Sequence, residues 1–60
     1  MKSIMIDLDA EFVRETEKAR LFRFELPDGP VWLPKAQHEW DEESGEVTLR
    51  EPLAIDKGLV

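Results

Sequence analysis

The sequence predicts a mainly β fold, a four-stranded antiparallel meander or open small barrel with a short C-terminal helix. Sixty residues suffice for a single domain, residues 1–60, and leave no room for a second core. Apolar and polar side chains alternate in several stretches, which is the pattern of half-buried strands. Near the C-terminus, a proline and a glycine are spaced like the two ends of a short helix.

The first strand is expected from residue 4 to residue 12. Strict alternation over this length favours a strand with one buried face. A helix from Asp9 to Ala19 is the alternative, with Asp9 as its N-cap, but the apolar face of such a helix would be thin. The apolar positions of the strand are Ile4, Ile6, Leu8, Ala10 and Phe12.

Two further strands, residues 18–26 and 31–40, are expected to pair as a hairpin. Between them lies the densest turn signal of the chain, Pro27-Asp28-Gly29-Pro30. Pro34 has no amide proton for a ladder, so it should lie at an edge or a bulge. We expect Phe22, Phe24 and Leu26 to share the face that lies in the core, and Leu21 falls on the opposite face.

The last third of the chain predicts an acidic loop, a fourth strand and a helix. Residues 41–46 form the loop, which turns at Ser44-Gly45, and residues 47–50 alternate as a short strand. Pro52 suits the first turn of a helix, and Gly58 suits the position just past its end. Three apolar side chains would dock this segment on the sheet: Leu53, Ile55 and Leu59.

Charge and composition exclude several classes of protein. The net charge is −6, which is the opposite sign from that of an evenly basic nucleic-acid binder. The chain has no cysteine, so disulfides, thiolate metal sites and thiol catalysis are excluded, and a reducing cytoplasm is expected. Apolar runs stop at three or four residues, so we expect neither a membrane span nor a signal peptide.

Three segments resemble a pattern seen in small uncharacterised bacterial and phage-encoded β proteins. They are residues 14–19 (Arg-Glu-Thr-Glu-Lys-Ala), 31–37 (Val-Trp-Leu-Pro-Lys-Ala-Gln) and 52–59 (Pro-Leu-Ala-Ile-Asp-Lys-Gly-Leu), with Asp28-Gly29 between the first two. Ala36 departs from the serine that such proteins often have. The resemblance implies a compact β fold and a phage or prophage origin, and it transfers no catalytic residue.

Metal and catalytic sites find little support. Asp7, Asp9 and Glu11 alternate on one strand face and could bridge a hard cation such as Mg²⁺ or Ca²⁺, but nothing nearby completes a coordination shell. An outer face that discourages edge pairing is the simpler interpretation. His38 lacks a partnering nucleophile or further metal ligands, so we expect a partly exposed strand residue. We therefore predict no enzyme activity, no metal and no cofactor.

Aromatic and basic residues in one stretch indicate a second candidate function. The bases Arg14, Lys18, Arg20 and Arg23 are interleaved with Phe22 and Phe24, a combination typical of single-strand nucleic-acid surfaces. Mutual neutralisation is the simpler interpretation, since nearby acids could pair with them: Glu15, Glu17 and Glu25. Trp32 is expected in the core, and Trp40, beside the acidic loop, is the better candidate for partner contact. A nucleic-acid-binding barrel, which the net charge disfavours, would use Arg20, Phe22, Arg23 and Trp32.

Most of the negative charge lies in the second half. Residues 36–60 hold 7 acidic and 2 basic side chains, a net charge of −5, whereas residues 1–35 hold 7 and 6, a net charge of −1. Spaced carboxylates on a small scaffold can mimic a row of phosphates and occupy a basic groove. The leading hypothesis is a non-enzymatic binding protein, such as a phage-type accessory or anti-defence inhibitor, with a basic protein as partner. A homodimeric interaction module is a further alternative. The predicted contact residues are Glu39, Trp40, Asp41, Glu42, Glu43 and Glu46.

Overall fold

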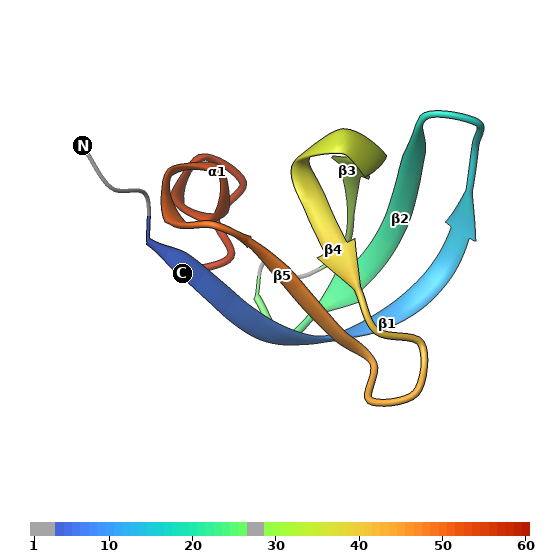
Figure 1. Ribbon diagram of the computed structural model, residues 1–60, viewed down its shortest axis with the longest axis horizontal. Coiled ribbons are helices and arrows are strands. Elements are labelled where there is room, and N and C mark those ends of the chain that lie inside the picture. The colour runs from blue at the N-terminus through green and yellow to red at the C-terminus, as the bar shows by residue number, and fades with distance from the viewer. Residues whose placement is uncertain (1–3, 27–28) are drawn as a thin grey trace.

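A computed structural model describes residues 4–26 and 29–60 and shows a five-stranded antiparallel sheet followed by one short helix (Figure 1). The predicted mainly β class with a C-terminal helix is confirmed, but the described residues form five strands rather than four. Pro27 and Asp28 of the expected turn lie outside the described residues. The elements are β1 (Met5–Glu15), β2 (Ala19–Phe24), β3 (Pro30–Pro34), the 3₁₀ helix η1 (Lys35–Gln37), β4 (His38–Trp40), β5 (Glu46–Arg50) and α1 (Glu51–Asp56).

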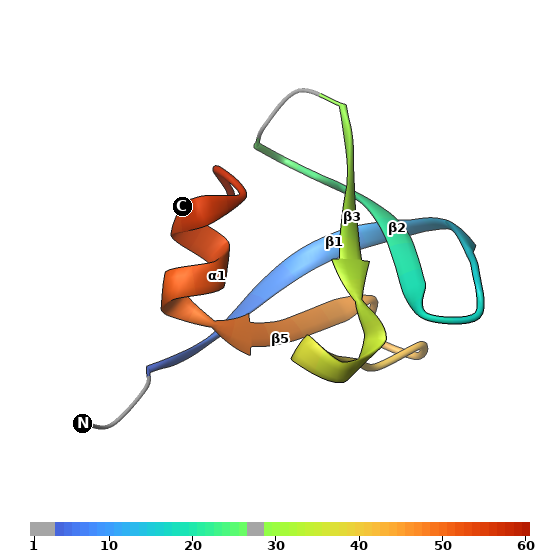
Figure 2. The same cartoon turned by 90° about the horizontal axis from the view of Figure 1, so that it is seen from above.

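The long strand β1 joins the two halves of the sheet, whose order is β3-β2-β1-β5-β4. Its first five residues pair with β5, and the residues from Ala10 to Glu15 pair with β2. The register shifts between Phe12 and Arg14, where a bulge adds twist to the strand. Segment 9–15 is therefore strand and not helix. β1 pairs with β5, which is distant from it in the sequence, so the sheet is not a simple meander (Figure 2). The sheet is open.

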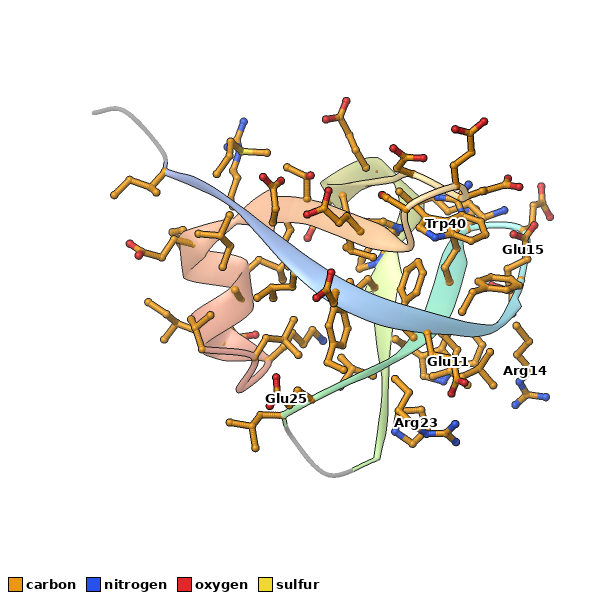
Figure 3. The ribbon with its side chains drawn as sticks, turned by 90° about the horizontal axis from the view of Figure 1, so that it is seen from below. Glu11, Arg14, Glu15, Arg23, Glu25 and Trp40 are labelled. Atoms are coloured by element: carbon orange, nitrogen blue, oxygen red, sulfur yellow. The ribbon has the colours of Figure 1, made fainter. Side chains whose placement is uncertain are left out.

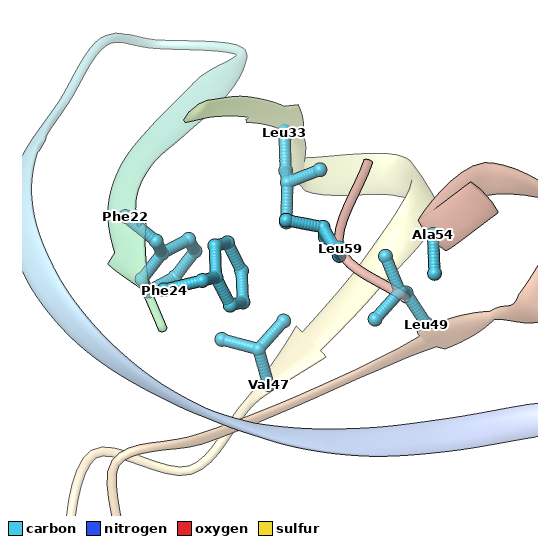
Figure 4. Packing of buried hydrophobic residues seen from close by; sticks show 7 residues of the cluster. All are labelled: Phe22, Phe24, Leu33, Val47, Leu49, Ala54 and Leu59. Atoms are coloured by element: carbon cyan, nitrogen blue, oxygen red, sulfur yellow. The ribbon is translucent and has the colours of Figure 1, made fainter. Parts of the chain in front are cut away.

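The core lies on the inner face of the curled sheet, as the alternation predicts for β1 and β5. Ile6, Leu8 and Ala10 point inward from β1 and pack against the buried cluster. Ile4 precedes β1 and is 58% exposed, so its predicted place on the buried face is wrong. The C-terminal segment covers one end of that cluster with Ala54 and Leu59 (Figure 4). The cluster consists of Phe22, Phe24, Leu33, Val47, Leu49, Ala54 and Leu59.

The expected third strand, residues 31–40, is in fact two strands. β3 pairs with β2, so the predicted hairpin is confirmed, and this strand ends at Pro34 on the edge of the sheet. Proline cannot continue the ladder, and the chain turns through η1 before β4 begins. β4 then pairs with β5 at the opposite edge.

Two apolar side chains of this hairpin, Leu26 and Trp32, lie elsewhere than predicted, whereas Leu21 lies on the predicted face. Leu26 is 64% exposed, because β2 ends at Phe24 and the alternation no longer applies. Leu21 faces outward but is buried, since it lies in one cross-strand row with Arg14 and Trp32, whose side chains flank it. Trp32 is 38% exposed on this outer face, so its expected place in the core is wrong.

Helix α1 ends as the sequence predicts, with Gly58 in the left-handed region at φ 76°. The amide of Leu59 donates to Ala54 O and the amide of Gly58 donates to Ile55 O, which is a Schellman motif. This turn directs Leu59 into the core, as expected. Ile55 remains 59% exposed, so its predicted docking role is wrong. In the described part of the chain, no helix has the length and apolarity required to cross a bilayer.

Candidate functional site

The outer surface of β1, β5 and β4 carries a set of carboxylates from three strands. Glu39 of β4 pairs with Thr48 of β5, which pairs on its other side with Asp7 of β1. In the next row, Glu46 of β5 lies opposite Asp9 of β1. Side chains in one row or in alternate positions share a face, so Asp9 lies about 5 Å from Glu46 and about 7 Å from Asp7, whereas Glu39 is two strands, or about 10 Å, from Asp7. We call this set, with the adjoining turn between β4 and β5, the acidic face: Asp7, Asp9, Glu39, Asp41, Glu42, Glu43 and Glu46.

The turn of the acidic face has a defined local structure. The amide of Glu43 donates to Asp41 Oδ1 at 3.0 Å, and the amide of Glu46 donates to Ser44 Oγ at 3.2 Å. Gly45 closes the turn at φ 79° and accepts a bond from the amide of Ala10. The turn is therefore fixed to β1, and its exposed carboxylates lie next to those of the sheet.

The acidic face has no neutralising partner in residues 4–26 and 29–60, since no Lys or Arg nitrogen lies within 4.0 Å of its carboxylates. The acids of the other half of the sheet are paired. Arg23 Nη1 lies 2.6 Å from Glu11 Oε1 (Figure 3), and Glu15 contacts both Lys35 and Arg20. The hydrogen bond from Lys35 and the nearby positive charges lower the pKa of Glu15. The chain thus neutralises one half of its sheet and leaves the other negative.

The three acids that alternate along β1 have different surroundings. Asp7 accepts a hydrogen bond from the Thr48 hydroxyl, and Glu11 is paired with Arg23. Only Asp7 and Asp9 belong to the acidic face, because Glu11 lies on the part of β1 that pairs with β2. Among the described residues, no three His, Asp or Glu side chains are placed to hold a metal ion.

Trp40 alone of the predicted contact residues points away from the acidic face. It is adjacent to Glu39 on β4, so the two side chains lie on opposite faces of the strand. Its ring stacks on Phe12 at 4.6 Å between centroids, and the guanidinium of Arg20 lies 5.1 Å from the indole centroid. Figure 3 shows Trp40 near Glu15, on the other side of β1 from Glu11. Contact between Trp40 and a partner stays a prediction.

His38 is buried, at 8% exposure, so the expected partly exposed position is wrong. Its Nδ1 donates to Pro34 O at 2.7 Å, because a carbonyl can only accept. The Nε2 atom must then accept from Arg20 Nη1, 3.3 Å away. Burial lowers the pKa of His38, and the charge of Arg20 lowers it further. The imidazole is a neutral structural link between β3, β4 and β2.

The basic stretch does not form the stacking surface that its composition suggested. Phe22 is fully buried, and Arg20 and Arg23 are held by Glu15 and Glu11. Arg14 and Lys18 remain at the surface, and the Arg14 guanidinium lies 5.6 Å from the centroid of the Trp32 ring system. Sequence reasoning did not identify this pair, since Arg14 and Trp32 meet only through the register of three strands.

A second feature that sequence reasoning missed is a notch beside the acidic face. It lies where η1 leads into β4 and β5 leads into α1, with a volume of about 580 Å³. Thr48 and Glu39 belong both to this notch and to the outer surface described above. Among the described residues, the lining comprises Met5, Ala36, Gln37, His38, Glu39, Thr48, Arg50, Pro52 and Leu53.

The geometry gives a charged, rigid surface next to a partly apolar hollow. Metal-ligand clusters are not found among the described residues, and the single histidine is used to hold strands together. No protein-family model, curated protein or solved structure matches the chain.

Proposed function

We propose that this chain is a non-enzymatic binding protein whose acidic face docks on a basic protein. One observation carries this proposal: within residues 4–26 and 29–60, the acids of one half of the sheet are paired with Arg and Lys and those of the other half are not. Unpaired carboxylates on a rigid sheet can meet cations of a partner without first breaking internal ion pairs. They also accelerate encounter with a positive surface.

The partner class that we propose is a nucleic-acid-binding protein. Carboxylates repeat at about 7 Å along a strand and about 5 Å between strands, so the acidic face offers a two-dimensional array of negative charge. A groove that evolved for phosphates would accept such an array. An accessory or anti-defence role, exerted through this binding, is part of the proposal.

The experiment removes charge from the turn while it keeps the shape. Asp41→Asn, Glu42→Gln and Glu43→Gln are combined, and the asparagine side chain introduced by Asp41→Asn would retain an oxygen that can accept from the backbone amide of Glu43. The matched control changes the same number of charges elsewhere, at Glu17, Glu25 and Asp56. The probe is a labelled oligolysine peptide, and its affinity is measured by fluorescence anisotropy at two salt concentrations.

The turn variant should bind oligolysine at least about tenfold more weakly at low salt, while the control variant stays close to the parent. Salt should reduce the parent's affinity, because exposed charges are screened over about 10 Å at 0.1 M. Equal loss in the turn variant and in the control would show that net charge, and not the acidic face, determines binding. That result would remove the proposal.

A nucleic-acid-binding function is the second candidate, and the exposed Arg14–Trp32 pair is the observation that favours it. A single-stranded oligonucleotide would stack on Trp32 and place a phosphate near Arg14. The same anisotropy assay with a labelled oligothymidine separates the two functions. Binding that Trp32→Ala abolishes would support this candidate over the first.

A further inference from the structure

We propose that the basic partner inserts an apolar side chain into the notch between η1 and α1, so that the occupant is a cationic amphipathic segment and not a uniformly charged surface. This inference rests on the proposed function and adds the kind of partner. The notch and the acidic face are continuous, because Glu39 and Thr48 line both. A segment that places cations on the acidic face must therefore run past the notch.

The walls of the notch are chemically suited to an apolar side chain. Met5 is 51% exposed on the outer face of β1, although the residues that follow it on that face are acidic. Leu53 of α1 and Ala36 of η1 add aliphatic surface from the two sides. Methionine adapts its shape to different partners, and a hollow of about 580 Å³ is within the usual size of binding sites.

Charge around the notch fixes how the segment lies. Glu39 belongs to the side that continues into the acidic face, where Asp7 lies in the same row, two strands away and beyond Thr48. Arg50 lies at the other side, opposite Met5, and has no carboxylate partner among residues 4–26 and 29–60. A lysine of the segment is attracted by Glu39 and repelled by Arg50. The apolar side chain consequently lies nearer Arg50 than the lysines do, and carbonyl oxygens of the segment can accept bonds from the Arg50 guanidinium.

Two labelled peptides of equal charge test this inference. One is a short oligolysine with two leucines at one end, and the other has serines in place of the leucines. The notch is altered by Met5→Ser, which removes apolar surface, and separately by Ala36→Phe, which fills the space. Neither position is buried, so the fold should tolerate both changes. Leu26→Ser is the matched control, because Leu26 is 64% exposed and lies outside the notch.

The parent should bind the leucine peptide about tenfold more tightly than the serine peptide, which corresponds to about 1.4 kcal/mol. Met5→Ser and Ala36→Phe should each remove this preference and leave the affinity for the serine peptide unchanged. Leu26→Ser should keep the preference. Equal affinity of the parent for the two peptides, or a preference that survives both notch variants, overturns the inference while the proposed function stands. Failure of both peptides to bind at low salt removes both.

Discussion

Replacement of Phe22 tests the inner face of the sheet most directly. The ring is fully buried, and its centroid lies 5.4–6.0 Å from those of four other aromatic side chains: Phe12, Phe24, His38 and Trp40. Phe22→Ala should cost about 3–5 kcal/mol in transfer and cavity terms. A domain of this length has only about 3–9 kcal/mol in total, at roughly 0.05–0.15 kcal/mol per residue. The alanine variant should therefore be largely unfolded.

Phe22→Leu gives a quantity that can be measured. Leucine keeps most of the buried area but loses the aromatic edge contacts, so we expect a loss of about 1–3 kcal/mol in the free energy of unfolding. Urea denaturation followed by tryptophan fluorescence reports it, because Trp40 lies 5.6 Å from Phe22 between centroids. Leu26→Ala, at the position that the alternation wrongly placed in the core, should cost less than about 0.5 kcal/mol. Similar losses in the two variants would refute the observed register of β2.

Three further predictions concern single positions. Folding lowers the pKa of His38, so below about pH 6.5 the unfolded chain binds a proton that the folded chain does not, and stability should fall. Thermal melts from about pH 7.5 to 5.5 should show a smaller decline in melting temperature for His38→Gln than for the parent. Gly45→Ala should cost about 1–2 kcal/mol by urea denaturation, since φ 79° strains any residue with a Cβ, and unchanged stability would contradict the turn geometry. Glu46→Lys should stabilise the fold by about 0.2–1 kcal/mol and weaken oligolysine binding, because a cation would then face Asp9; a melt and an anisotropy titration check the two effects.

The sequence allowed prediction of most local structure, because period-two alternation and turn residues act over a few positions. It placed β1 on its correct face and anticipated Gly45 and Gly58 at their turns. It failed where a strand ended. Leu26 follows the pattern of Phe24 but lies beyond the last residue of β2, and the alternation has no physical basis once the ladder stops.

The acidic face could be predicted only in part, because it depends on long-range pairing. The acids of the turn are consecutive and easily seen, whereas Asp7 and Asp9 join them through the pairing of β1 with β5, across about forty residues of sequence. The same limit applies to His38. Its ring packs edge-on against Phe22 and contacts the guanidinium of Arg20, both on β2, and neither neighbour is suggested by the residues next to His38 in the chain.

The cross-strand pair of Glu46 and Asp9 supports a functional role for the acidic face. Like charges directly opposite each other destabilise a sheet, and a lysine at either position would relieve the repulsion. The chain uses this kind of relief elsewhere along β1. In the part of β1 that pairs with β2, Glu11 of β1 lies opposite Arg23 of β2. A sheet that places opposite charges across its strands in one half but not in the other loses stability in the second half. Binding to a cationic partner would remove that repulsion, so the partner should raise the melting temperature of the parent more than that of Glu46→Lys.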